Sequence, residues 1–198
     1  MLKYVKVICW GGIMNKKILY IDCDGVIFNT INEAYKMMEE EGLDHTNREL
    51  ANQYFKDVDW HLLIGRAGIL NDSIRKIKMI IKSNNFKDVK ILTKLCGNET
   101  EELAKRIAFA KLLPGIEVIT VALDESKAEV VGAKGDILVD DYFKNVNDWH
   151  NHNGIGILYD IENDNSLNSI NDLGVLSNRQ YVKFKNIWKQ KSISFCLV

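Results

Sequence analysis

The sequence predicts an α/β domain in which helices cover both faces of a parallel β-sheet. Short apolar runs of the kind that form buried strands alternate with segments whose apolar residues recur at helical spacing. The chain has a single proline, so the turns between these segments are predicted from glycine, asparagine and aspartate. Because a helical segment connects each strand to the next, the strands are expected to be parallel, with right-handed crossovers between them. Strands are expected at residues 17–21, 89–92, 116–121, 136–139 and 155–159.

The segments between the strands predict helices. NEAYKMMEEE at 32–41 places Ala34, Met37 and Met38 on one side and stops at Gly42. Residues 47–83 contain no strand-like run, and their apolar spacing predicts a compact set of helices. Residues 163–178, rich in Asn, Asp and Ser, are expected to form a loop or weak helix. Further helices are expected at 99–113, which opens with glutamates that suit the helix dipole, and at 126–131, 142–151 and 178–191.

Length and composition limit the classes of protein to consider. The 198 residues fit one domain, or one core with a modest insertion. A net charge of -1 with scattered lysines gives no support for a membrane-surface or extended nucleic-acid partner, and no apolar stretch reaches membrane-spanning length. The four cysteines lie far apart, which favours a reducing cytoplasm. We expect a cytoplasmic protein, with residues 1–13 as an upstream extension before a start at Met14.

Chemically informative residues follow four of the predicted strands. Because the carboxyl ends of parallel strands meet at one edge of a sheet, we expect these side chains to converge there, where open α/β sheets bind ligands. The residues are Asp22 and Asp24 after the first strand, Thr93 after the second, Lys127 after the third, and Asp140 with Asp141 at the fourth.

The carboxylates in this set predict a metal ion. Two unit charges about 4 Å apart repel by roughly 4 kcal/mol at an effective dielectric near 20, and a divalent cation reverses the sign. An all-oxygen set with neither His nor Cys suits Mg²⁺, which we expect as the cofactor. Asp22 and Asp24, spaced i and i+2 and followed by Gly25, suggest a nucleophile and a proton donor beside that ion.

Strand order also selects among the lysines. Lys111 and Lys134 precede strands and therefore belong near the opposite edge of the sheet. Lys127 follows the third strand and can face the metal, and Lys94, beside Thr93, is the second choice. A lysine at this edge would neutralise phosphate oxygens and keep a nucleophilic aspartate ionised.

These motifs resemble a known family. DCDGV, Thr93 at a strand end, Lys127 and ILVDD are similar, in order, to the four motifs of the haloacid-dehalogenase (HAD) superfamily of phosphotransferases. The resemblance implies a Rossmann-like sheet with a small helical cap inserted after the first strand. It divides the chain into a core of residues 1–29 and 89–198 and a cap of residues 30–88. The spacing from ESKAEVV to ILVDD and the DxDGV form look most like the 5'(3')-deoxyribonucleotidase branch.

The resemblance also implies roles for the two aspartates of the first motif. Asp22 resembles a nucleophile that attacks phosphorus, becomes an aspartyl-phosphate and binds the metal. Asp24 resembles the acid that protonates the leaving oxygen and then the base for the hydrolytic water. Its backbone carbonyl would also bind the metal.

The other three motifs would hold the phosphate and the ion. Thr93 would hydrogen-bond a phosphoryl oxygen, and Lys127 would pair with that phosphate and with Asp22. Asp140 would bind Mg²⁺ directly, while Asp141 would bind it or orient a metal-bound water. One departure is that Thr93 is followed by KLCGN, without a second hydroxyl, so backbone amides would share the binding of phosphate.

The expected activity is therefore Mg²⁺-dependent hydrolysis of a small phosphate monoester, most simply a nucleoside or deoxynucleoside 5'(3')-monophosphate. A sugar phosphate, a polynucleotide 3'-phosphate and a phosphate-binding module without turnover remain alternatives, and association into a homodimer stays open. Several aromatic residues could stack on a nucleobase or pack in the core, with Phe28, just beyond the first motif, as the first choice. The others are Tyr35, Tyr54, Phe55 and Trp60.

Overall fold

The computed structural model describes residues 16–161 and 169–178, and its centre is a six-stranded parallel sheet with the order β3-β2-β1-β4-β5-β6. The predicted α/β class is confirmed. No helix within the described ranges is long and apolar enough to cross a membrane. The strands are β1 (Ile18–Ile21), β2 (Asp88–Lys94), β3 (Glu117–Val121), β4 (Ile137–Asp140), β5 (Ile155–Tyr159) and β6 (Ser169–Ile170).

The five expected strands are present, with ends that differ by no more than one or two residues. The sixth strand, β6, was not expected, because residues 163–178 were assigned to loop or weak helix. It has two residues, too few to show an alternating pattern, and is followed by the 3₁₀ helix η2 (Leu173–Ser177). The predicted extension at 1–13 lies outside the described residues, as does all but the first residue of the closing helix predicted at 178–191.

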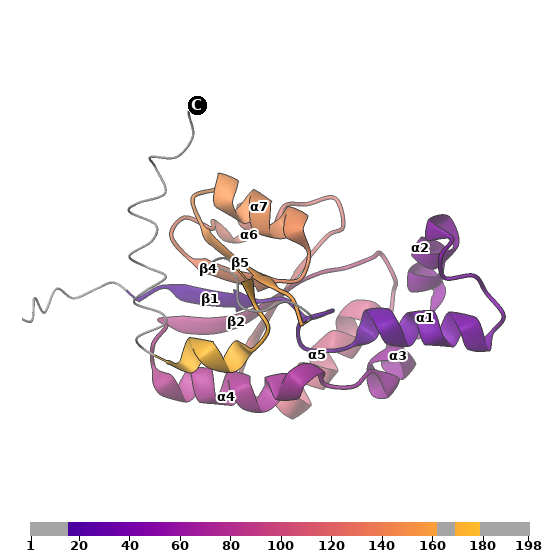
Figure 1. The fold of residues 1–198 in the computed structure, drawn as a ribbon, viewed down its shortest axis with the longest axis horizontal. Coiled ribbons are helices and arrows are strands. Elements are labelled where there is room, and N and C mark those ends of the chain that lie inside the picture. Colours follow the sequence, from indigo (N-terminus) through magenta and orange to yellow (C-terminus); the bar gives the residue numbers. More distant parts are fainter. Residues whose placement is uncertain (1–15, 162–168, 179–198) are drawn as a thin grey trace, which may run out of the picture.

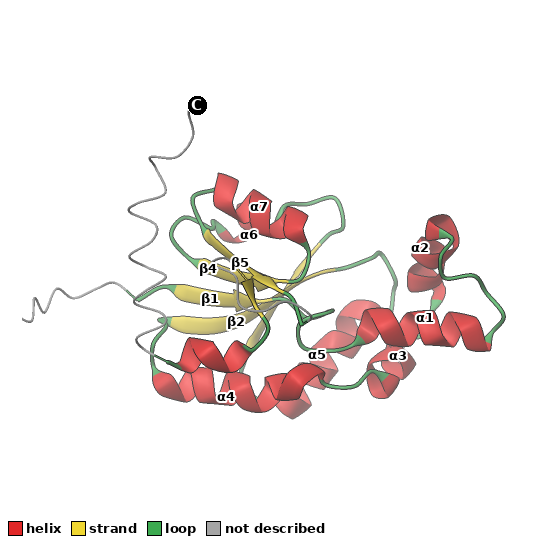
Figure 2. Ribbon diagram, viewed as in Figure 1, coloured by secondary structure: helices red, strands yellow, loops and turns green. Residues whose placement is uncertain are grey.

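Helices cover both faces of the sheet because each central strand is apolar on both sides. Leu19 and Ile21 of β1 pack into one buried cluster, and Tyr20 packs into another on the opposite face. The first face is covered by α4 (Ser73–Ser83) and α5 (Glu101–Leu112), and the second by α6 (Lys127–Val131) and α7 (Phe143–Asn151). Figures 1 and 2 show α6 and α7 above the sheet and α4 below it.

A separate group of helices, which we call the cap, lies beyond the end toward which β1 runs. It consists of α1 (Thr30–Glu40), α2 (Arg48–Asp57) and α3 (Trp60–Arg66), at the right of Figure 1. These helices have a small apolar cluster of their own, which meets the core at α5 and at Cys96 in the loop before it. The buried members of the cluster are Ala34, Met37, Val58, Trp60 and Leu63 of the cap region and Ala104 of α5.

Helix α4 packs differently from the cap helices, although the predicted cap of residues 30–88 includes it. Its apolar stripe, Ile74, Ile77 and Ile80, belongs to the same buried cluster as Leu19 and Ile21 of β1. As a domain boundary the predicted range stays a prediction. The packing favours a shorter cap that ends near residue 69, with α4 as the crossover helix between β1 and β2.

The two connections between cap and core run side by side. The Asn29 N–H donates to the Gly68 carbonyl, and the Leu70 N–H donates to the Ile27 carbonyl, each at 2.9 Å. Phe28 and Ile69 pair as an antiparallel bridge between these bonds. The chain therefore enters and leaves the cap through one two-chain connection, which leads into the short 3₁₀ helix η1 (Leu70–Asp72).

The position of α4 generates a stability prediction. Ile77→Ala removes a fully buried side chain from the sheet cluster, and we expect the free energy of unfolding to fall by about 2–5 kcal/mol. Ile81→Ala on the same helix removes a side chain that is 48% exposed, and the expected change is below about 1 kcal/mol. Urea denaturation measures both. Equal losses in the two variants would contradict the assignment of α4 to the sheet layer.

Candidate active site

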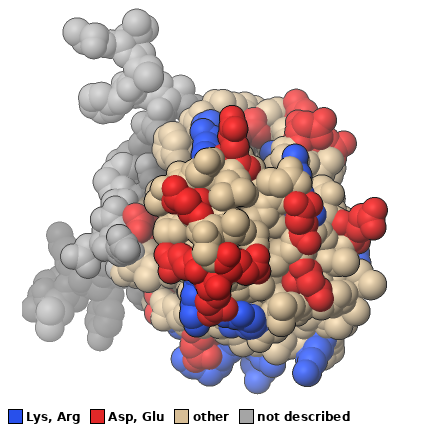
Figure 3. Space-filling view, turned by 90° about the vertical axis from the view of Figure 1, so that its right-hand side faces the viewer, with Lys and Arg blue, Asp and Glu red and all other residues tan. Residues whose placement is uncertain are grey.

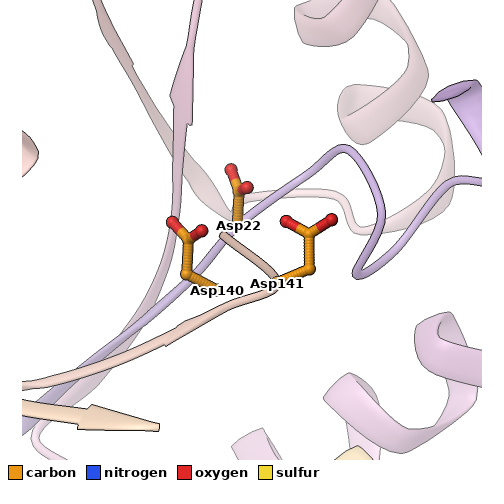
Figure 4. A group of neighbouring side chains, drawn as sticks. All are labelled: Asp22, Asp140 and Asp141. Carbon is orange, nitrogen blue, oxygen red and sulfur yellow. The ribbon is translucent and has the colours of Figure 1, made fainter. Parts of the chain in front are cut away.

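Three carboxylates meet where β1 and β4 end. The parallel register pairs Ile21 with Val139, and the Asp22 N–H donates to the Val139 carbonyl at 2.9 Å, so Asp22 lies beside Asp140. One oxygen from each of Asp22, Asp140 and Asp141 lies within 4.8 Å of the others. Figure 4 shows the three carboxylates pointing to the same side of the sheet edge. The expected convergence is therefore present, while the chemical roles of these residues stay predictions.

Lys127 joins two members of this group. Its Nζ lies 2.7 Å from Asp22 Oδ1 and 2.7 Å from Asp140 Oδ2, and the side chain is buried. The residue stands in the first turn of α6, where the Ser126 side chain caps the helix by accepting from the Ala128 and Glu129 N–H groups. Burial opposes the lysine charge, but Asp22 and Asp140 outweigh it and raise the pKa of Lys127. The structure thus places Lys127 where strand order predicted it.

Asp140 is held by groups that the sequence analysis did not identify. Its Oδ1 accepts from the Tyr142 N–H at 2.9 Å, and both oxygens lie within 3.2 Å of Asn145 Nδ2. Asn145 lies in the first turn of α7, five residues after Asp140. A polar residue in the first turn of the helix after the fourth strand is the signal that could have identified it.

Asp141 lies against the backbone of the first motif. A Cβ atom on Gly25 would stand 1.9 Å from Asp141 Oδ2, so no larger residue fits there without moving the carboxylate. Gly25 also has a φ of +73°, which favours glycine. The glycine of DCDGV therefore both turns the chain and makes room for the third carboxylate.

Asp24 faces a different set of partners. Its Oδ1 accepts from Thr30 Oγ1 at 2.7 Å, and its Oδ2 accepts from Lys105 Nζ at 2.6 Å. Thr93 is buried. Its Oγ1 lies 3.4 Å from Asp24 Oδ2 and accepts from Lys105 Nζ at 2.9 Å. The Asp24 side chain is thus not among the three clustered carboxylates, and metal binding through its backbone carbonyl stays a prediction.

Lys105 is a second residue of the site that sequence reasoning missed. It lies on α5 one turn after Glu101, to which it is paired at 2.7 Å, and its side chain is 0% exposed. A search restricted to strand ends could not find it, because it is carried by the helix after β2. The signal available was a Glu-Lys pair at i and i+4, which usually marks a solvated helix face.

Two predicted substrate contacts, Phe28 and Lys94, stay predictions that the packing does not favour. Phe28 is 2% exposed and packs on Phe109 in the sheet cluster, with ring centroids 5.6 Å apart, so it has no free face for a nucleobase. The Lys94 ammonium donates to the Leu123 carbonyl at 3.2 Å. Successive side chains of a strand point to opposite faces of the sheet. Because Thr93 faces Asp24, the side chain of the next residue, Lys94, points away from Asp24.

The other aromatic candidates belong to the cap. Trp60 is buried, and its indole Nε1 donates to the Phe55 carbonyl at 3.1 Å. Tyr54 donates through its hydroxyl to Glu41, and Tyr35 stacks on His45. Contact with a substrate stays a prediction for all of them.

The electrostatics of the three clustered carboxylates favour a bound cation. Burial raises the pKa of Asp22 well above its usual value, and Asp140 and Asp141 act in the same direction against Lys127. Burial, followed by the charge on Asp140, raises the pKa of Asp141 to about 7. A divalent ion between these oxygens would remove the cost of ionising them. An all-oxygen set of this kind fits Mg²⁺, with Asp22, Asp140 and Asp141 as the side chains able to hold it.

Comparison with known proteins gives a fold match. No protein-family model and no curated protein matches the chain. The HAD-hydrolase YfnB from Bacillus subtilis, solved bound to magnesium, aligns with a TM-score of 0.55 at 12% identity, over 82% of this chain and 97% of that one. The chain has the HAD-like fold. Two further structures support this fold. A haloacid dehalogenase-like family hydrolase from Xanthomonas campestris aligns with a TM-score of 0.59 at 12% identity, over 90% of this chain and 95% of that one. A subfamily IA HAD-superfamily hydrolase from Geobacter sulfurreducens aligns with a TM-score of 0.53 at 14% identity, over 86% of this chain and 97% of that one.

The contact between Gly25 and Asp141 predicts a defect in cation binding. Gly25→Ala displaces the Asp141 carboxylate, and we expect the affinity for Mg²⁺ to fall at least about tenfold. Gly42→Ala is the matched control, because Gly42 has a similar φ of +75° with open space around its Cβ position. Both variants lose some stability through backbone strain. Only Gly25→Ala should lose the rise in thermal unfolding temperature on titration with Mg²⁺, and an unchanged rise would contradict the role of Asp141.

The raised pKa of Asp141 predicts how stability depends on pH without divalent ions. In the folded state the group keeps a proton up to about pH 7, whereas in the unfolded chain it releases the proton near pH 4. The Asp141 carboxyl therefore contributes on the order of 2–4 kcal/mol to the free energy of unfolding. This contribution is complete below about pH 4 and is lost as the pH rises through 7. Urea denaturation in EDTA measures the fall. Asp141→Asn should make the fall smaller, the remainder coming from Asp22, and exposed Asp124→Asn should leave it unchanged.

Proposed function

We propose that the protein is a Mg²⁺-dependent phosphomonoesterase that works through a phosphorylated Asp22. The observation that carries the proposal is the meeting of Asp22, Lys127 and two further carboxylates at one sheet edge, on the HAD-like fold. Asp24, two residues after Asp22, supplies a second carboxyl for proton transfer. This second aspartate favours a phosphatase over hydrolases of the same fold that lack it.

The proposed first step transfers the phosphoryl group to the enzyme. An Asp22 carboxylate oxygen forms a bond to phosphorus while the ester P–O bond breaks, and the leaving oxygen takes a proton from the Asp24 carboxyl. Lys127, paired with Asp22, lies where it can also pair with a phosphoryl oxygen. Bound Mg²⁺ would supply charge neutralisation for the phosphoryl oxygens.

The second step returns the enzyme to its starting state. A water molecule gives its proton to the ionised Asp24 carboxylate, and its oxygen forms a bond to phosphorus. The bond between phosphorus and the Asp22 oxygen breaks, which releases inorganic phosphate and the Asp22 carboxylate. The cap would cover the reacting groups and exclude competing water in the first step.

The substrate we propose is a small phosphorylated metabolite. A nucleoside or deoxynucleoside monophosphate is supported by the resemblance of the motifs, although Phe28, the first candidate for base stacking, is only 2% exposed. A sugar phosphate is the alternative. A polynucleotide end is less favoured, because Figure 3 shows acidic side chains spread over the face on which the cap lies. Exposed acidic residues of the cap region are Glu39, Glu40, Glu41, Asp44, Glu49, Asp57 and Asp59.

The nucleophile assignment is tested by Asp22→Asn. We expect this variant to lose at least about 1,000-fold in kcat, because an amide oxygen does not form the acyl phosphate, while its far-ultraviolet circular dichroism stays unchanged. The measurement is phosphate release from p-nitrophenyl phosphate with Mg²⁺ and with EDTA. Asp124→Asn makes the same substitution at an exposed position on the loop after β3 and should keep wild-type activity.

A substrate panel then separates the alternatives. Nucleoside 5'- and 3'-monophosphates, sugar phosphates, 3'-phosphorylated oligonucleotides and a 2-haloacid are offered to the wild-type enzyme with Mg²⁺. Preference for one class of small phosphate ester identifies the substrate. Halide release without phosphate release would overturn the phosphatase assignment, and binding of phosphate without any turnover would favour a non-catalytic module.

A further inference from the structure

A fully buried lysine lies next to the three clustered carboxylates but touches none of them. The Lys105 ammonium is within 2.6 Å of Asp24 Oδ2, 2.7 Å of Glu101 Oε1, 2.9 Å of Thr93 Oγ1 and 3.2 Å of the Lys94 carbonyl. It thus joins the first motif to the end of β2. A buried ammonium with this many acceptors has little freedom to move.

The same contacts determine how Asp24 is oriented. Lys105 holds one carboxylate oxygen, and the Thr30 hydroxyl, at the first residue of α1, holds the other at 2.7 Å. The side chain of Asp24 remains 21% exposed, more than Lys105 or Glu101. Asp24 is therefore fixed at both oxygens and still accessible, as a group that exchanges a proton with substrate must be.

The cap closes the remaining side of Lys105. The Trp60 ring lies 4.7 Å from Lys105 Nζ, within cation–π distance, and is itself 3% exposed. The backbone N–H of Trp60 donates to Thr100 Oγ1 at 3.2 Å, which holds the residue in place. An aromatic ring on the cap thus keeps water from a charge that belongs to the core.

Further bonds fasten this part of the cap to the loop that precedes α5. Asn98 Nδ2 donates to the Lys56 carbonyl at 2.7 Å and to the Val58 carbonyl at 2.9 Å. Cys96 contacts the Phe55 carbonyl at 3.0 Å. The junction between α2 and α3 is therefore seated on the same loop and helix that carry Glu101 and Lys105.

We propose that Lys105 is the positioning residue for the Asp24 carboxyl, and that Trp60 completes its environment only when the cap is seated on the core. The proposal rests on the proposed phosphatase mechanism and deepens it. It states that proton transfer to the leaving oxygen depends on a core lysine and on the seating of the cap. The competing explanation is that Lys105 only pairs with Glu101 to hold α5 in place.

The dependence of the rate on the leaving group separates these explanations. A poor leaving group needs the proton from Asp24 when the ester bond breaks, whereas p-nitrophenolate departs without it. The quantity to compare is kcat/KM, because it reports the steps up to loss of the leaving group and excludes hydrolysis of the phosphoenzyme, which all substrates share. The substrates are p-nitrophenyl, phenyl and benzyl phosphate, in order of increasing leaving-group basicity.

Lys105→Met should lower kcat/KM for benzyl phosphate about 100-fold and for p-nitrophenyl phosphate less than about fivefold, with phenyl phosphate between them. Lys111→Met is the matched control, because Lys111 is exposed near the end of the same helix. It should behave as wild type with all three substrates. Equal losses for the three substrates in Lys105→Met, or no loss, would overturn the proposal.

Two further variants keep the test informative if Lys105→Met does not fold with Glu101 left unpaired. Glu101→Gln with Lys105→Met removes both charges of the buried pair and should show the same selective loss. Glu101→Gln alone keeps the lysine on Asp24 and should show no selectivity among the substrates. If Glu101→Gln alone lost kcat/KM for benzyl phosphate as selectively as the double variant, the loss would be due to breaking the Glu101–Lys105 ion pair. That result would overturn the proposed role of Lys105.

The part played by the cap is tested at Trp60. Trp60→Leu should give a selective loss of about five- to tenfold for benzyl phosphate, and Trp60→Phe, which keeps an aromatic face, less than about threefold. Unselective losses in Trp60→Leu would refute the coupling to the cap. If the wild-type enzyme releases no phosphate from any substrate, the proposed function fails, which is a different outcome from a wild-type enzyme whose Lys105 variants lack selectivity.

Discussion

The site depends on the balance of charge at the carboxyl edge of the sheet. Five carboxylates, those of Asp22, Asp24, Glu101, Asp140 and Asp141, lie in or beside it. Within the described ranges, Lys105 and Lys127 are their ion-pair partners. If all were ionised, three negative charges would remain in excess. The phosphate monoester that we propose as substrate would add more negative charge, and a divalent cation that reduces the excess would favour its binding.

The parallel sheet explains why residues more than a hundred positions apart can share this edge. β1 lies between β2 and β4, so the ends of these strands bring Asp22, Thr93 and Asp140 together. That convergence was predictable, because it follows from strand order and from the rule that parallel strands end at one edge. Lys127 was predictable for the same reason. The sheet, its order of helices and the group of three carboxylates all depend on apolar patterns long enough to recognise.

The remaining features depend on information that a single strand or helix pattern does not contain. Lys105 and Asn145 lie within helices, where spacing alone does not distinguish a buried polar contact from a solvated one. Phe28 was assigned to substrate from its place after the first motif, but the antiparallel bridge with Ile69 and the neighbouring Phe109 hold it in the core. Helix α4 has the same amphipathic pattern as the cap helices, and only its contacts show that it packs on the sheet.

The two lysines divide the carboxylates into two groups with different tasks. Lys127 pairs with Asp22 and Asp140, which belong to the proposed nucleophile and metal site, whereas Lys105 pairs with Asp24 and Glu101. Buried ion pairs seldom add stability, so two of them beside one site are more readily explained by the geometry they impose. Thr30 begins the first cap helix and Trp60 begins the third, and they contact Asp24 and Lys105. Displacement of the cap would therefore alter the surroundings of Asp24 before it altered those of Asp22.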